Sequence, residues 1–150
     1  MNHKRVHILL VEDNPQDAEL ILRALNKQNL SGNVLVARDG AEALEILFAP
    51  GGENNDLLEN LKVILLDVKL PKVSGQEVLQ KIKADGRTRS IPVVCLTSSS
   101  EESDINECYH WGCNSYIVKP VEFDEFTQAI TSLASYWVLL NQTSPQSCTL

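Results

Sequence analysis

Five side chains of the types used in phosphoryl transfer directly follow four apolar runs of the chain. In chain order they are Glu12 and Asp13, Asp67, Thr97, and Lys119. A carboxylate such as that of Asp67 can attack phosphorus and form an aspartyl phosphate. Three carboxylates brought together repel one another unless a cation lies between them, and a hard divalent ion with oxygen ligands meets that need. The set therefore predicts phosphoryl chemistry that depends on Mg²⁺ or Mn²⁺.

Each of these residues has an expected role. Asp13 and Asp67 are expected to be direct metal ligands, with Glu12 acting through water. The backbone carbonyl of Lys69, two residues after Asp67, would add a further oxygen. Lys119 is a compact point charge, suited to neutralising the charge that develops on the phosphoryl oxygens.

Alternating strands and helices must hold these side chains in place. Short apolar runs predict parallel strands buried on both faces, at about residues 6–11, 34–37, 62–66, 92–96 and 116–118. Helical patterns lie between and after the strands, and the last is expected over 122–140. The fold class is α/β, a doubly wound five-stranded parallel sheet of flavodoxin-like order 2-1-3-4-5 with five helices. In such a sheet the carboxyl ends of the strands form the binding edge, where the five side chains would meet.

The chain of 150 residues is expected to be one domain over 1–150, with a core of about 6–135 and a C-terminal extension over 136–150. Residues 49–60 contain Pro50-Gly51-Gly52 and predict a long loop. Ser99 and Glu102 have the spacing of a capping box, which predicts a helix that begins there and stops at Gly112.

The ordered motifs resemble response-regulator receiver domains over about residues 6–135. They are Val11-Glu12-Asp13, Leu66-Asp67-Val68-Lys69-Leu70-Pro71 with Gly75, Leu96-Thr97-Ser98, and Tyr116-Ile117-Val118-Lys119-Pro120. The resemblance implies that Asp67 accepts phosphate from a histidine kinase and that the domain catalyses its own Mg²⁺-dependent phosphorylation and dephosphorylation. It also implies that Thr97 and Lys119 contact the phosphoryl group, that Tyr116 swings inward with it, and that the Lys119–Pro120 bond is cis.

The narrower similarity is to cyanobacterial phytochrome-associated response regulators, and it rests on the long loop, the residues of the fourth helix and the C-terminal aromatic pair Tyr136-Trp137. That similarity implies a stand-alone receiver whose partner is a light-sensing histidine kinase. It also implies a homodimer formed through the fourth helix, fifth strand, fifth helix and C-terminal extension.

Residues 136–140 are consecutive apolar residues, and a helix packed on one side should not be apolar all round. Either the following tail folds back over them or another protein covers them. We favour a protein–protein contact through Tyr136, Trp137, Val138 and Leu140.

Other classes of function fit less well. A net charge of −7 with scattered basic residues argues against nucleic-acid binding, and the apolar runs are too short to span a membrane. No secretory leader is recognised, so we expect a cytoplasmic protein. Cys108, His110 and Cys113 could suggest a metal site, but we interpret the cysteines as reduced, structural thiols. A phosphatase would need an acid where Lys69 stands, and a flavin or nucleotide binder would need a phosphate loop in place of Glu12-Asp13. A phosphorylation-independent scaffold stays open.

Overall fold

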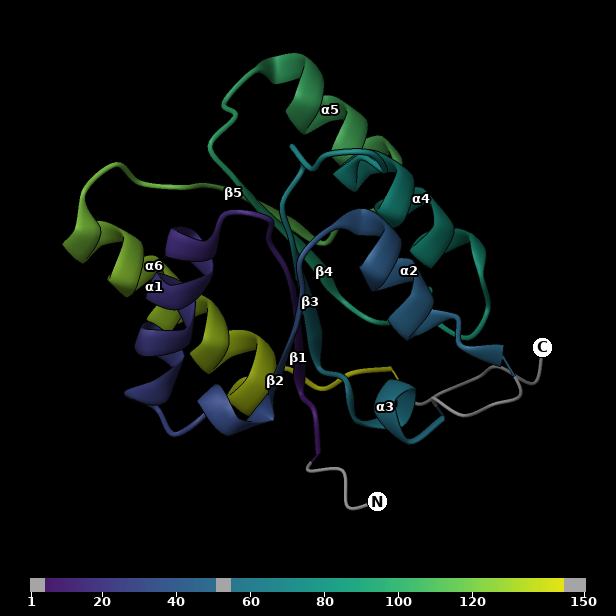
Figure 1. Ribbon diagram of the computed structural model, residues 1–150, viewed down its shortest axis with the longest axis horizontal. Helices are drawn as coiled ribbons and strands as arrows, with labels where there is room; N and C mark the ends of the chain where they lie inside the picture. Colours follow the sequence, from purple (N-terminus) through teal and green to yellow (C-terminus); the bar gives the residue numbers. More distant parts are fainter. Residues whose placement is uncertain (1–4, 51–54, 145–150) are drawn as a thin grey trace.

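The computed structural model describes residues 5–50 and 55–144. Its centre is a five-stranded parallel sheet of order β2-β1-β3-β4-β5, which confirms the predicted order (Figure 1). The strands are β1 (Ile8–Val11), β2 (Val34–Ala37), β3 (Val63–Leu66), β4 (Val93–Thr97) and β5 (Ser115–Val118). Every residue of β1, β3 and β4 is buried, as expected for strands covered on both faces, whereas β2 and β5 are the partly exposed edges.

The strand register brings the carboxyl ends of four strands to the same edge of the sheet. Val11 pairs with Leu66 across β1 and β3, so the next residues, Glu12 and Asp67, leave the sheet side by side. Leu66 pairs with Cys95 and Thr97 pairs with Val118, so Thr97 and Lys119 lie one and two residues further along their strands than Asp67.

Helices cover both faces of the sheet. On one face, α1 (Pro15–Asn26) packs against α6 (Phe123–Ala134); on the other lie α2 (Gly40–Leu47), α4 (Gly75–Ala84) and α5 (Glu102–His110) (Figure 1). Because successive strand residues point to opposite faces, Ile8 and Leu10 enter the core under α1 and α6, while Leu9 and Val11 enter the core under α2 and α4.

Two local predictions are wrong. Residues 55–60 of the predicted loop form a short helix, α3 (Asn55–Asn60), because Leu58 is buried in the core; this makes six α-helices in the described ranges instead of five. The capping box at Ser99 is absent: α5 begins at Glu102, and the Ser99 hydroxyl donates to Asp104 Oδ2 at 2.5 Å. Its end before Gly112, whose φ is 99°, is confirmed.

The C-terminal helix continues past α6 as a π-helical segment, Ser135–Leu140. Within it Trp137 and Val138 are partly buried against the core under α1 and α6, whereas Tyr136 and Leu140 are exposed. The predicted partner surface is therefore divided between a core-facing half and a solvent-facing half. Residues 51–54 and the tail 145–150 lie outside the described residues.

Two further expectations concern the backbone and the membrane. Every peptide bond in the described ranges is trans, including Lys119–Pro120, which differs from the cis bond that the resemblance implied. None of the helices in those ranges combines the length and apolar character needed to cross a bilayer.

Candidate functional site

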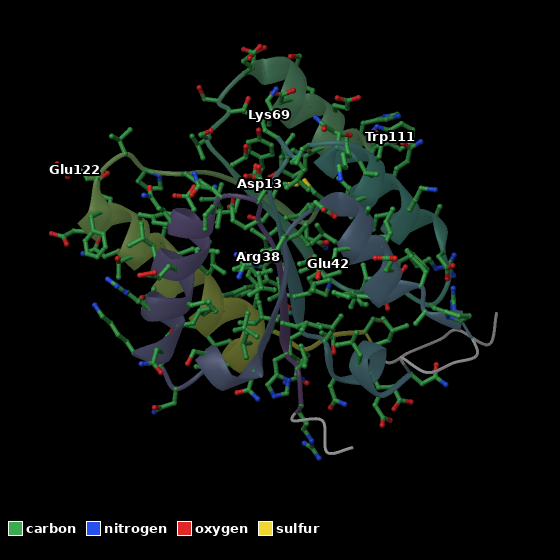
Figure 2. The ribbon with its side chains drawn as sticks, viewed as in Figure 1. Asp13, Arg38, Glu42, Lys69, Trp111 and Glu122 are labelled. Carbon is green, nitrogen blue, oxygen red and sulfur yellow. The ribbon has the colours of Figure 1, made fainter. Side chains whose placement is uncertain are left out.

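The carboxyl ends of the strands gather a compact acidic group. Oxygen atoms of Glu12, Asp13 and Asp67 all lie within 4.8 Å of one another. Glu12 and Asp67 are buried, 1% and 7% exposed, whereas Asp13 is open to solvent. Figure 2 labels Asp13 and Lys69 at this end of the sheet. Three carboxylate donors with one solvent-facing side fit a hard divalent cation that keeps some of its water ligands.

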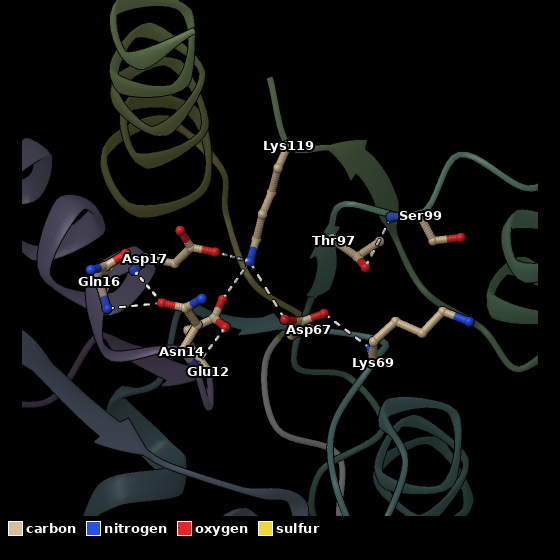
Figure 3. Close-up of polar contacts among 9 residues, drawn as sticks. All are labelled: Glu12, Asn14, Gln16, Asp17, Asp67, Lys69, Thr97, Ser99 and Lys119. Atoms are coloured by element: carbon tan, nitrogen blue, oxygen red, sulfur yellow. Dashed lines mark hydrogen bonds and ion pairs between the residues drawn. The ribbon is translucent and has the colours of Figure 1, made fainter. Parts of the chain in front are cut away.

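Lys119 carries the positive charge of the site. Its Nζ lies 2.7 Å from Glu12 Oε1, 2.8 Å from Asp17 Oδ2 and 3.5 Å from Asp67 Oδ2 (Figure 3). The lysine side chain is only 10% exposed. An ammonium group has three N–H donors, so these three carboxylates can take all of them.

Burial and charge pull the pKa values of this pair in opposite directions. Burial raises the pKa of the Glu12 carboxyl to about 7, although the hydrogen bond and charge of Lys119 act to lower it. Burial alone would lower the pKa of the Lys119 ammonium, but its hydrogen bonds to Asp17 and Glu12 raise it above its ordinary value. Lys119 therefore stays positively charged, whereas the Glu12 carboxyl binds a proton at a higher pH than an ordinary glutamate does.

Backbone groups orient the acidic side chains. The Asn14 N–H donates to Glu12 Oε2 at 3.1 Å, and the Lys69 N–H donates to Asp67 Oδ1 at 3.0 Å. The first residue of α4, Gly75, packs against the Asp67 backbone so closely that an added Cβ would lie 2.3 Å from the Asp67 carbonyl oxygen. Asp67 is therefore fixed from two sides. The proposed ligand role of the Lys69 carbonyl stays a prediction.

Thr97 and Tyr116 belong to a second group of contacts beside the carboxylates. Thr97 is fully buried, and its Oγ1 accepts a hydrogen bond from the Ser99 N–H at 3.3 Å. The Tyr116 hydroxyl donates to the Ser99 carbonyl oxygen at 2.9 Å. Burial raises the pKa of the Tyr116 phenol to about 12, opposed by its hydrogen bond with Ser99. Both predicted switch residues thus contact the loop between β4 and α5.

Two partners were missed from the sequence. Asp17 contacts Lys119 from the first turn of α1, although an acid at that position is already explained by the helix dipole. Asp104 joins the second group: its Oδ2 lies 3.2 Å from Lys69 Nζ and also accepts the Ser99 hydroxyl. No local sequence pattern marks either contact.

Comparison with known proteins places this geometry in a family. The model of the response regulator receiver domain matches residues 8–131. Response regulator Rcp1 of Synechocystis is 35% identical over 131 residues, which cover 87% of this chain and 88% of that protein.

Solved structures agree with this. The phosphorylated cyanobacterial phytochrome response regulator RcpA superposes with a TM-score of 0.84 at 35% identity, covering 95% of this chain and all of that one. The Mn²⁺-bound form of Rcp1 gives 0.83 at 32% identity over 95% of this chain and all of that one. The bacteriophytochrome response regulator AtBRR gives 0.68 at 51% identity over 93% of this chain and all of that one. The chain belongs to the response regulator receiver domain family.

Proposed function

We propose that this protein is a response regulator that takes a phosphoryl group on Asp67 from a phosphohistidine of a sensor kinase. The observation that carries the proposal is the edge of the sheet where Glu12, Asp13 and Asp67 form one group and Lys119 bonds two of them. That arrangement holds a nucleophile, an acidic metal group and a cation within reach of one incoming phosphoryl group.

In the proposed transfer, an Asp67 carboxylate oxygen forms a bond to phosphorus while the phosphorus–nitrogen bond to the kinase imidazole breaks. The imidazole leaves with the electron pair of that bond and takes up a proton. The Lys69 N–H holds one Asp67 oxygen at 3.0 Å, which leaves Oδ2, on the Lys119 side, to attack. Lys119 then meets the negative charge that builds on the phosphoryl oxygens. A divalent ion held by Glu12, Asp13 and Asp67 would supply further positive charge when bound, and support for Mg²⁺ or Mn²⁺ comes from the Mn²⁺-bound form of Rcp1.

The switch that we propose begins at Thr97. A phosphoryl group brings roughly −1.5 to −2 charges, by analogy with other phosphorylated side chains. The Thr97 hydroxyl would turn to donate a hydrogen bond to this group. Its present hydrogen bond from the Ser99 N–H would then break. Because Tyr116 bonds the Ser99 carbonyl, a shift of the loop frees the tyrosine to move inward. The surface of α5, β5 and α6 would then change its packing.

The kinase that we propose is a phytochrome. Support comes from the solved relatives, among them a cyanobacterial phytochrome response regulator and a bacteriophytochrome response regulator at 51% identity. We also propose a homodimer that uses the exposed half of the π-helical segment, where Tyr136, Leu139 and Leu140 are 50%, 61% and 69% exposed. We propose that this protein and its kinase act in the cytoplasm.

The central test compares the wild type with Asp67→Asn during incubation with Mg²⁺ and acetyl phosphate, with intact-protein mass as the readout. Only the wild type should gain one phosphoryl group. Glu19→Gln, an exposed site in α1, serves as the matched control and should label like the wild type. Equal labelling of Asp67→Asn and wild type would refute Asp67 as the acceptor.

The kinase assignment needs its own experiment. A bacteriophytochrome kinase, radiolabelled on its histidine by ATP, should pass the label to the wild type at least about tenfold faster than an unrelated histidine kinase does. Equal rates from the two kinases would contradict the phytochrome assignment while leaving Asp67 as the acceptor.

A further inference from the structure

Asp17 bonds the site lysine from a helix that carries none of the predicted site residues. It is the third residue of α1, and its own N–H is capped by Asn14 Oδ1 at 3.1 Å. In a capping box the side chain at this position would reach back to the N–H of the N-cap residue. Here the Asn14 N–H donates to Glu12 instead, so the Asp17 carboxylate is free to bind Lys119 Nζ at 2.8 Å.

The contact differs from an ordinary surface ion pair. The Asp17 side chain is 32% exposed and Lys119 only 10% exposed, and 102 residues separate them in the chain. Asp17 is also outside the group of carboxylates whose oxygens can share one metal ion, which contains Glu12, Asp13 and Asp67. A cation that binds that group therefore competes with Lys119 for Glu12 and Asp67, but leaves Asp17 bonded to Lys119.

The distances from Lys119 Nζ to its partners show on which side of the site the ammonium group lies. Lys119 Nζ lies 2.8 Å from Asp17 and 3.5 Å from Asp67, so the ammonium group is closer to α1 than to the nucleophile. Any phosphoryl oxygen added at Asp67 must attract the same ammonium group away from Asp17. The three acids that bond Lys119, together with Asp13, also place four carboxyl groups around one ammonium group.

We propose that Asp17 is a positioning residue that holds Lys119 toward α1, strengthening metal binding and restraining phosphoryl transfer; this rests on the proposed function. Removing its charge has two opposite effects. Lys119 then relies on Glu12 and Asp67 alone and competes harder with a divalent ion, so the ion binds more weakly. With the metal group saturated, Lys119 is free to move to the phosphoryl oxygens, so transfer to Asp67 becomes faster.

A purely local role for Asp17 predicts something else. An acid in the first turn of a helix stabilises the helix dipole whatever it touches. If that were its whole contribution, Asp17→Asn would lower the melting temperature slightly and leave metal affinity and the transfer rate unchanged. A general disturbance of the site would weaken both. A change in the hold on Lys119 instead moves the two quantities in opposite directions.

The experiment uses the full chain as wild type, Asp17→Asn, Asp17→Glu and Glu19→Gln. Asparagine keeps the shape of the side chain and can still accept a hydrogen bond, and glutamate restores the charge. Glu19 lies on the same helix, exposed and paired with Arg23, so its variant removes one charge away from Lys119. The first readout is the affinity for Mn²⁺ without phosphodonor, from the electron paramagnetic resonance signal of the free ion. The second is the rate of labelling by phosphoramidate at saturating Mg²⁺.

Asp17→Asn should bind Mn²⁺ about two- to fivefold more weakly and label about two- to fivefold faster, the size expected for one partly exposed charge pair. Asp17→Glu and Glu19→Gln should stay near the wild type in both. Unchanged Mn²⁺ affinity in Asp17→Asn, or slower labelling at saturating Mg²⁺, would overturn the role assigned to Asp17. If the wild type itself takes no phosphoryl group, the proposed function fails, and the Mn²⁺ readout alone then decides whether Asp17 governs Lys119.

Discussion

The close approach of α4 to the end of β3 makes Gly75 the most sharply testable position in the chain. Gly75 begins α4 inside the capping box formed by Ser74 and Glu77, and its N–H donates to the Val68 carbonyl at 3.0 Å. An added Cβ would lie 2.3 Å from the Asp67 carbonyl oxygen and 2.6 Å from Val68 Cα. Both neighbours are backbone atoms of the segment that carries the proposed nucleophile, so no side-chain rotation can relieve the contact.

The cost of Gly75→Ala follows from these distances. To reach an ordinary contact, the Cβ and the Asp67 carbonyl would have to move apart by roughly 1 Å, and either α4 or the end of β3 must shift by that amount. Shifts of this kind in a packed region cost about 2–3 kcal/mol of unfolding free energy. For a chain of this length that corresponds to a melting temperature lower by about 4–12 °C. Labelling of Asp67 by acetyl phosphate should slow as well, because the Asp67 backbone moves.

Gly86→Ala is the matched control. A Cβ at Gly86 would meet nothing within 4 Å, and its backbone is outside the left-handed region. The same substitution there should stabilise the protein by up to about 1 kcal/mol, through the lower entropy of the unfolded chain. Urea unfolding and thermal melts followed by circular dichroism measure both variants. If Gly75→Ala unfolds within 0.5 kcal/mol (about the error of the method) of Gly86→Ala, the close approach does not constrain this helix and the reasoning is refuted.

Three further predictions concern charge, capping and assembly. Burial raises the Glu12 pKa from 4.5 to about 7, so the metal-free folded protein keeps a proton that the unfolded chain loses. Its unfolding free energy should therefore fall by about 2 kcal/mol as pH rises from 5 to 7.5. Urea titrations in EDTA measure this pH dependence, and Glu12→Gln should remove most of it. Thr88→Val should cost about 1–3 kcal/mol in the same assay, because the buried hydroxyl donates to the Ile82 carbonyl at 2.7 Å near the end of α4 and valine leaves that oxygen unpaired. Replacing the exposed Leu139 and Leu140 by serine should weaken the proposed homodimer at least about tenfold in sedimentation without lowering the melting temperature, and an unchanged mass would contradict the assigned surface.

The sheet and the acidic group were predictable because both follow from local patterns and one topological rule. Short apolar runs buried on both faces mark the central strands, and parallel strands place their carboxyl ends at one edge. Glu12 and Asp67 therefore meet as soon as β1 and β3 pair, whatever the details of the helices. The exact register, with Val11 opposite Leu66, does not follow from the apolar pattern, because both strands are buried on both faces.

The missed features depend on partners far away in the chain. The composition of residues 49–60 indicates a loop, and only the position of Leu58 in the core explains why part of it is helical. Ser99 has the spacing of a helix cap, yet its hydroxyl goes to Asp104 and its carbonyl accepts the Tyr116 hydroxyl. Asp17 satisfies a local rule so well that nothing in the sequence indicates a second role. Local patterns name the residues that can form a site, but the tertiary contacts decide their partners.

Those contacts also determine how an event at Asp67 can reach β5, and two connected routes are present. The first route begins at the hydrogen bond from the Lys69 N–H to Asp67. It continues through the Lys69–Asp104 ion pair to Ser99, whose hydroxyl donates to Asp104. Its weak step is that ion pair, because the Lys69 side chain is 58% exposed, and such pairs contribute about 0–1 kcal/mol.

The second route runs through Lys119, whose ammonium group bonds Asp67 and whose backbone N–H donates to the Thr97 carbonyl at 2.7 Å. Lys119 is 10% exposed and Thr97 is fully buried, so water competes little for these bonds. We therefore expect a displacement of Lys119 to reach the junction of β4 and β5 more effectively than a displacement of Lys69, whose exposed side chain can move in solvent. Under the proposed function, Lys119 is therefore the stronger of the two connections between Asp67 and Thr97, and Asp17 influences this connection by bonding Lys119.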